Sequence, residues 1–176
     1  MALDEMTNAE LLDWALTAAK SAVEEISGME STGFEPILQV ATRDRDTDEG
    51  VINVVPLSGM PDYDDGDARH AGVNMVGRIM ASSSVLANSE LELVLHVSEA
   101  WMTKIALDKG VADRSEVVVI HGITADGKVA KGMSAEILRD EDDVITGVGE
   151  WQSMDGMDDA LLKSFLLGYY AGEVVL

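Results

Sequence analysis

The chain has 176 residues, with 33 Asp and Glu against 12 Lys and Arg, and its formal net charge is −21 at pH 7. This charge excludes sequence-independent binding to nucleic acids and anionic membranes, because their phosphate groups would be repelled from most directions. The absence of Cys excludes disulfides, thiolate metal sites and a thiol nucleophile. A hydrophobic fraction of 47% is ordinary for a folded protein, and we expect one domain over residues 1–176.

Two features of the chain bear on its compartment. The first residues are acidic, whereas a secretory signal begins with a basic segment followed by an apolar one. The apolar runs, such as 117–120, are far shorter than the roughly 20 residues that span a bilayer. We therefore expect a cytoplasmic protein that does not bind membranes.

The sequence predicts a first helix over residues 8–27. Thr7 and Glu10 have the spacing of a capping box, in which each side chain bonds the other residue's backbone N–H. Apolar residues then recur at spacings of three and four, and Gly28 follows as a stop signal. The predicted inner face of this helix consists of Leu12, Leu16, Ala19, Val23 and Ile26.

Residues 36–41 and 51–57 predict two β-strands, because both segments are short, rich in β-branched residues and bounded by turn formers. The charged segment 43–50 between them indicates a hairpin. A second helix is predicted to begin after Asp67 as its N-cap and to end near Ala87. Within it, Gly72 and Gly77 would permit a close approach to the sheet.

Residues 91–102 alternate in polarity, which is typical of a strand. The apolar face of this strand is predicted to comprise Leu91, Leu93, Leu95, Val97, Glu99 and Trp101. Glu99 therefore occupies a position at which an apolar residue is expected.

Segments 117–123 and 129–138 predict a second hairpin around the Asp126-Gly127 pair, a sequence typical of a type I′ turn. This turn would place Val119 opposite Ser134 and His121 opposite Gly132.

The C-terminal part of the chain predicts an acidic loop at 140–143, a short strand at 148–152 and a helix from Asp155 to Gly172. The complete order is α-β-β-α-β-β-β-(β)-α. Strands adjacent in sequence favour antiparallel pairing. We therefore predict an α+β fold with a mostly antiparallel sheet of about five or six strands and two to three helices packed on it. This order is similar to that of roadblock-type dimerising domains.

Three short strings carry a further resemblance: Ser98–Met102 (Ser-Glu-Ala-Trp-Met), 114–116 (Arg-Ser-Glu) and 149–151 (Gly-Glu-Trp). Together with the Asp-Gly turn, they resemble an uncharacterised group of bacterial and phage proteins. No activity is established for that group, so the resemblance implies the sheet and leaves the function open.

Glu99, His96 and His121 are the candidate catalytic residues. A carboxylate on an apolar strand face needs either a hydrogen-bonding partner or a raised pKa. A structural Glu99 would bond a neighbouring backbone group, an Arg or a Trp indole, whereas a functional one would serve acid/base chemistry. His96 and His121 could meet on one sheet face, where Gly132 would leave room for a ligand.

The loop at 62–67 holds the candidate metal ligands Asp62, Asp64, Asp65 and Asp67. Carboxylate oxygens suit hard divalent cations. An EF-hand is excluded, because glycine and the bidentate Glu do not fall at the required loop positions. The alternative is a loop that only caps the following helix. We expect no cofactor, since neither dinucleotide-binding glycines nor a phosphate-binding Gly-Lys-Ser/Thr string occurs.

Three functions remain open. The first is a non-enzymatic interaction protein, which self-associates or binds a partner protein through its first helix or a sheet edge. The second is an acidic nucleic-acid mimic that inhibits a DNA-binding protein, and the third is a hydrolase-like enzyme with a cross-strand Glu/His site. The acidity itself is also typical of proteins adapted to a high-salt cytoplasm.

Overall fold

A computed structural model gives the structure of the protein and describes residues 6–83, 86–106, 111–154 and 159–172. Over these residues the chain forms three helices and seven strands. In chain order the elements are α1 (Asn8–Ser27), β1 (Ile37–Asp44), β2 (Gly50–Pro56), α2 (Gly66–Ser82), β3 (Ser89–Ala106), β4 (Val111–Thr124), β5 (Ala130–Arg139), β6 (Ile145–Val148), β7 (Gln152–Ser153) and α3 (Ala160–Gly172).

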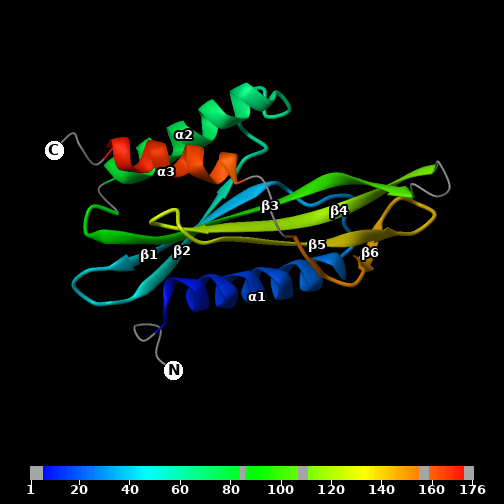
Figure 1. The fold of residues 1–176 in the computed structure, drawn as a ribbon, viewed down its shortest axis with the longest axis horizontal. Coiled ribbons are helices and arrows are strands. Elements are labelled where there is room, and N and C mark those ends of the chain that lie inside the picture. The colour runs from blue at the N-terminus through cyan, green and yellow to red at the C-terminus, as the bar shows by residue number, and fades with distance from the viewer. Residues whose placement is uncertain (1–5, 84–85, 107–110, 155–158, 173–176) are drawn as a thin grey trace.

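The strands form an antiparallel sheet in the order β2-β1-β3-β4-β5-β6, and β7 also pairs with β5. α1 lies on one face of this sheet, and α2 and α3 lie together on the other (Figure 1). The predicted α+β fold and element order are confirmed. The sheet has seven strands where about five or six were predicted, and in place of one strand at 148–152 there are two, β6 and β7, separated by 149–151. No helix in the described ranges combines the length and apolar character that crossing a membrane requires.

The first helix begins and ends as predicted. The Thr7 hydroxyl accepts from the Glu10 N–H, and the Glu10 carboxylate accepts from the Thr7 N–H at 2.8 Å, which confirms the capping box. The predicted inner residues are buried as far as Val23, but Ile26 is exposed. Ser27, four residues after Val23, takes the inward position in the last turn.

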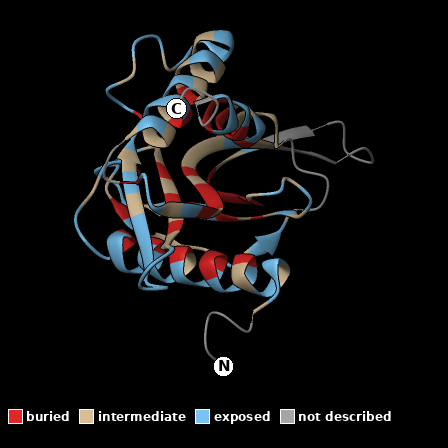
Figure 2. Ribbon diagram, turned by 90° about the vertical axis from the view of Figure 1, so that its left-hand side faces the viewer, coloured by how far each residue is buried: buried red, intermediate tan, exposed pale blue. Residues whose placement is uncertain are grey.

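Apolar side chains on both faces of β3 contribute to two separate cores. Leu93 packs against α1, whereas Val94 packs against α2 and α3. Leu91 was predicted to share the face of Leu93 and lies instead in the α2–α3 core. The pairing of β1 with β3 shifts register at this point, and a bulge at Glu92 reverses the alternation of side chains. Figure 2 shows the buried residues on the sheet and on the inward sides of the helices.

The predicted bounds of the second helix were wrong at both ends. Asp65, rather than Asp67, is the N-cap, and its carboxylate accepts from the Ala68 N–H at 2.8 Å. α2 ends at Ser82, earlier than the predicted Ala87. The predicted start of the last helix, Asp155, lies outside the described residues.

Two glycines allow α2 and α3 to pack in close contact. A Cβ placed on Gly77 would overlap Phe165 O and lie 2.8 Å from Tyr169 N, so Gly77 lies against α3 rather than against the sheet as predicted. A Cβ on Gly168 would overlap Asn74 O and lie 2.8 Å from the Asn74 carbonyl carbon. The predicted role of Gly72 was also wrong, since a Cβ there would meet the Met60 side chain.

The hairpin of β4 and β5 has the predicted register but a different turn. Val119 pairs with Ser134 and His121 with Gly132, as expected. A type I′ turn requires positive φ at both central residues. Among the residues of this turn, Gly127 is the one with positive φ, at 70°, and its N–H donates to Thr124 O at 2.8 Å. A longer loop, closed by Thr124 and Val129, therefore keeps the same register.

We predict that Gly168→Ala destabilises the protein by about 1–3 kcal/mol, because the added methyl group forces α2 and α3 apart. Helix propensity alone predicts the opposite sign, since Ala is favoured over Gly in a helix by about 1 kcal/mol. Urea unfolding measures the difference. Gly59→Ala is the control, because a Cβ at Gly59 would meet nothing within 4 Å. A stabilised Gly168→Ala variant would contradict the close helix contact.

Candidate functional site

A polar cavity lies where β3 extends past the start of β1. β1 begins at Ile37 opposite Val97, so β1 does not cover the β3 edge from Ser98 onward. A cavity of about 690 Å³ opens at this edge. It is lined by Phe34, Pro36, Ser58, Met60, Asp62, Tyr63, Asp64, Arg69, Ser98 and Glu99. The structure thus brings Glu99 close to part of the acidic 62–67 loop.

Glu99 holds the segment before β1 against the sheet. Its Oε1 accepts from the Phe34 N–H at 2.6 Å, and Arg139 Nη2 lies 3.9 Å from the same oxygen. A Cβ on Gly33 would lie 3.1 Å from Oε1, so the backbone approaches this carboxylate closely. The backbone hydrogen bond expected of a structural Glu99 is therefore present. Trp101, predicted to lie in the core beside it, is exposed instead.

At the other side of the cavity, Tyr63 contacts both Arg69 and His96. Tyr63 Oη lies 3.2 Å from His96 Nε2. The Arg69 guanidinium lies 4.7 Å from the centre of the Tyr63 ring, and Arg69 Nε donates to Tyr63 O at 2.8 Å. Arg69 therefore holds both the backbone and the ring of Tyr63, which directs the phenol toward His96.

The structure places His96 and His121 opposite each other on β3 and β4, with Gly132 opposite His121 on β5. This confirms the predicted arrangement of the two histidines on one sheet face. The pKa of His96 is lowered to about 4, chiefly by burial and to a smaller extent by the nearby His121 and Arg69. His96 is therefore neutral at pH 7, and its Nε2 can share a single hydrogen with the Tyr63 hydroxyl.

Glu99 and His96 do not form one catalytic set. Residues an odd number apart on a strand point to opposite faces. His96 faces α2 and α3 through Tyr63, whereas Glu99 Oε1 bonds the Phe34 backbone. The predicted acid/base pair is therefore divided by β3 itself.

The acids of the 62–67 loop have different positions. Asp62 and Asp64 line the polar cavity, Asp65 caps α2, and Asp67 lies in the first turn of α2, where a negative charge stabilises a helix. In the part of the chain that the structure describes, no three His, Cys, Asp or Glu side chains are placed to hold a metal ion. The loop therefore has the helix-capping role that the sequence allowed, with Asp65 as the cap.

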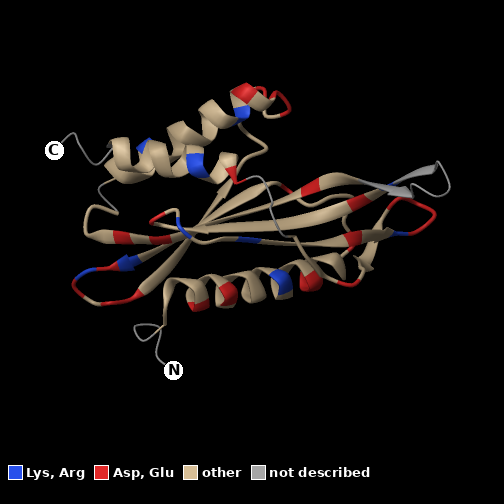
Figure 3. Ribbon diagram, in the orientation of Figure 1, with Lys and Arg blue, Asp and Glu red and all other residues tan. Residues whose placement is uncertain are grey.

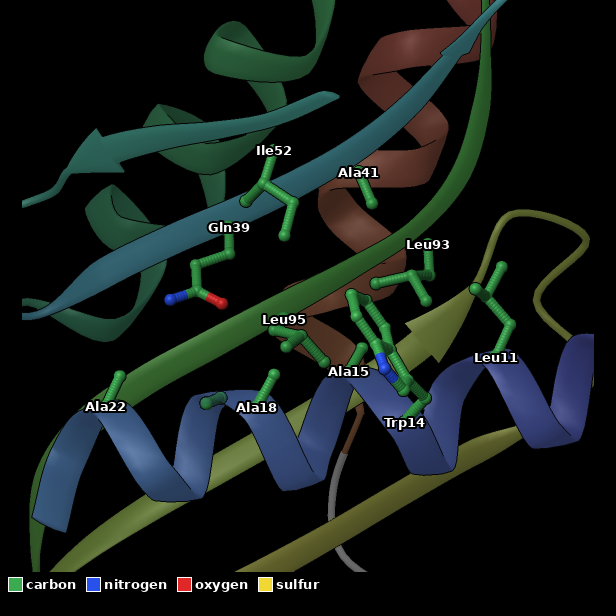
Figure 4. Close-up of a pocket in the computed structure, with 11 residues that line it drawn as sticks. Leu11, Trp14, Ala15, Ala18, Ala22, Gln39, Ala41, Ile52, Leu93 and Leu95 are labelled. Atoms are coloured by element: carbon green, nitrogen blue, oxygen red, sulfur yellow. The ribbon is translucent and has the colours of Figure 1, made fainter. Parts of the chain in front are cut away.

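A second, apolar hollow lies between α1 and the β1–β2 end of the sheet, and we call it the α1–β2 groove (Figure 4). Its volume is about 230 Å³. Side chains from α1 and from the strands point toward one another across it (Figure 4). The eleven lining residues are Leu11, Trp14, Ala15, Ala18, Ala19, Ala22, Gln39, Ala41, Ile52, Leu93 and Leu95.

Large apolar side chains are exposed around this groove. Trp14 is 44% exposed and Ile52 is 49% exposed. Val54, which pairs with Gln39 and so lies on the same face as Ile52, is 56% exposed. None of the eleven lining residues is charged, although 26% of the chain is. A contiguous exposed apolar surface of this kind is typical of a binding surface.

Acidic residues border the α1–β2 groove on two sides (Figure 3). Helix α1 carries four acidic residues and one Lys, and the 43–49 turn beside β2 carries four acidic residues and two Arg. Glu25 lies three residues after Ala22 and seven after Ala18, so it continues the groove side of α1. The groove is therefore an apolar strip between two borders of net negative charge.

The sequence predicts binding through the first helix or a sheet edge, but it does not predict this groove. Two signals for it were present. Trp14 is a large apolar residue outside the predicted stripe, and β2 is apolar at adjacent positions such as Val51 and Ile52. Such a strand is expected to be covered on both faces, yet β2 lies at the sheet edge.

We predict that His96→Gln reduces the loss of stability in mild acid. Because the pKa of His96 is about 4 in the folded protein, below the ordinary value of about 6.5, the unfolded chain binds more protons below that pH. Stability is therefore lost as pH falls from about 6.5 toward 4, and this loss reaches about 2 kcal/mol near pH 5. Urea unfolding near pH 7 and pH 5 should show a smaller loss in the variant by about that amount. Equal losses in the two proteins would contradict the buried, neutral state of His96.

No protein-family model, no curated protein and no solved structure matches the chain. The resemblance to bacterial and phage proteins therefore stays a prediction, and the function is inferred from the geometry of the two hollows.

Proposed function

We propose that the protein is a non-enzymatic interaction module that holds an apolar, basic segment of a partner protein in the α1–β2 groove. The observation that carries this proposal is the exposure of Trp14, Ile52 and Val54 around an uncharged hollow. Large aromatic and aliphatic side chains around a pocket supply most of the energy of a protein interface. Burying these apolar side chains against a partner contributes favourable free energy. The charged surface that covers much of this chain, of net charge −21, does not offer that contribution.

The charge around the groove favours a basic partner over a second copy of this chain. Lys and Arg on both sides of an apolar partner segment would meet the acidic borders formed by α1 and the 43–49 turn. Two copies would instead bring acidic borders together, and that contact is opposed by repulsion except at high salt. The polar cavity supports an enzymatic function less well, because Glu99 bonds the Phe34 backbone and β3 separates it from His96.

We predict that Ile52→Asp weakens the binding of a Lys-flanked apolar peptide by at least about tenfold, whereas Val51→Asp changes that affinity by less than about twofold. Each residue is 49% exposed on β2, and the two point to opposite faces. The substitutions therefore add the same charge at neighbouring positions, one inside the groove and one outside it. The expected loss corresponds to about 1.4 kcal/mol, which is modest for a charge placed in an apolar contact.

The probes are two Lys-flanked peptides of about ten residues and identical composition. One carries Val and Leu at alternating positions, and the other carries them at helical spacings of three and four. Anisotropy of the labelled peptides measures binding, and a Glu-flanked version tests the charge argument. Binding of a basic peptide should weaken with added KCl.

Three outcomes would overturn the proposal. They are the failure of both basic peptides to bind, equal binding of the Glu-flanked version, and an affinity loss in Val51→Asp as large as that in Ile52→Asp. Sedimentation provides an independent check on the occupant. A dimer of the whole chain that strengthens in molar KCl and is lost in Ile52→Asp would replace the basic partner with a second copy.

A further inference from the structure

β2 has one open edge along its whole length. It pairs with β1 through residues 50–56 without a register shift, and it lies at the end of the strand order in the described sheet. In antiparallel pairs, the residues that exchange backbone hydrogen bonds alternate with residues that do not. The direction of every N–H group in β2 can therefore be derived from bonds at its two ends.

Two hydrogen bonds define this alternation. Leu57 N donates to Pro36 O at 2.8 Å, and Asp44 N donates to Glu49 O at 2.9 Å. Residues 49 and 57 therefore bond toward β1, and so do the odd-numbered residues between them. The even-numbered residues, of which Ile52 and Val54 are central, direct their N–H and C=O groups away from β1.

Ile52 and Val54 thus present two kinds of binding group together. Their backbone groups point to the open edge, while their side chains lie on the face that forms the α1–β2 groove. A strand placed beside β2 would bond these backbone groups, and every second side chain of that strand would lie on the groove face. Backbone pairing and apolar contact would therefore occur in one binding event.

Over residues 50–55, β2 lacks the features by which sheet edges are normally protected. Charged residues, bulges and prolines usually prevent an edge strand from pairing with other chains. From Gly50 to Pro61 the chain carries no charged residue, and the pairing of β1 with β2 contains no bulge. Pro56 interrupts the edge at the last residue of the strand, which leaves 50–55 able to pair.

We propose that the partner segment binds as an added β-strand on the open edge of β2, with alternate apolar side chains in the α1–β2 groove and with Lys or Arg at its ends. This mode of binding rests on the proposed function and goes further, since it specifies an extended rather than a helical partner. It predicts that the alternating peptide binds and that the peptide with helical spacing does not.

N-methylation of the alternating peptide tests this inference with a matched pair of probes. One version is methylated at odd positions and the other at even positions, so that the two have equal composition. A strand directs alternate N–H groups to opposite sides, so one version should lose at least about tenfold in affinity and the other less than about threefold. Equal effects of the two patterns, in either direction, would overturn strand addition.

A second test changes the protein. Val54→Pro removes an N–H group that points away from β1, a position at which proline is tolerated on an edge strand. It should retain the cooperative unfolding of the wild type and lose at least about tenfold in peptide affinity. Val54→Thr is the matched control, because it keeps the N–H group and the β-branched shape.

Hydrogen exchange gives a third readout without any substitution. In the free protein the Ile52 and Val54 amides should exchange faster than those of Val51 and Asn53, and the bound peptide should slow exchange at Ile52 and Val54 but not at Val51 and Asn53. Binding of the helical peptide with unchanged exchange at Ile52 would refute strand addition while leaving the proposed function in place. Loss of the Ile52→Asp effect would instead remove the proposed function itself.

Discussion

A single helix is too narrow to cover one face of this sheet. Six neighbouring strands extend over about 24 Å, because adjacent strands lie about 4.8 Å apart, whereas a helix with its side chains is about 10 Å wide. α1 packs chiefly on β4 and β6, with a smaller contact on β3. The other face receives a pair of helices, α2 and α3, in close contact through Gly77 and Gly168. Among the helices of the described chain, none therefore covers the β1–β2 end of the α1 face.

Under the proposed function, a partner protein would bind at this uncovered end. Most of the apolar surface of the described chain is enclosed in the two cores (Figure 2). Ile52 remains exposed because α1 packs on β3, β4 and β6 rather than on β2, and Trp14 of α1 is partly exposed beside the groove. The acidic residues lie mainly in turns and on helices, and a smaller number lie on β3, β4 and β5 (Figure 3). The lining of the α1–β2 groove carries no charged residue.

Local features were predictable from the sequence, and features that depend on distant contacts were not. The capping box of Thr7 and Glu10 and the register of β4 with β5 follow from residues within a few positions of one another, and both are confirmed. The bulge at Glu92 arises from pairing with β1, about fifty residues earlier in the chain. It could not be inferred from an alternating pattern that continues through it unchanged.

The candidate sites show the same division. The sequence indicated that His96 and His121 share a face, because that follows from the hairpin register and strand alternation. It did not indicate that Tyr63 contacts His96 or that Phe34 bonds Glu99, since both contacts come from segments that close over the β3 edge. The groove was beyond prediction for a related reason. Its walls belong to elements whose lateral offset is determined by the whole packing arrangement.

The geometry of β2 also determines which partner loses conformational entropy on binding. β2 is already ordered by its pairing with β1, so its outward backbone groups need no rearrangement before they accept a strand. A flexible partner would lose conformational entropy of about 1–2 kcal/mol for each residue that it orders. Apolar contact in a groove of about 230 Å³ offsets only part of that entropy loss. The complex should therefore be moderate in affinity and reversible, with selectivity arising from the acidic borders rather than from the size of the contact.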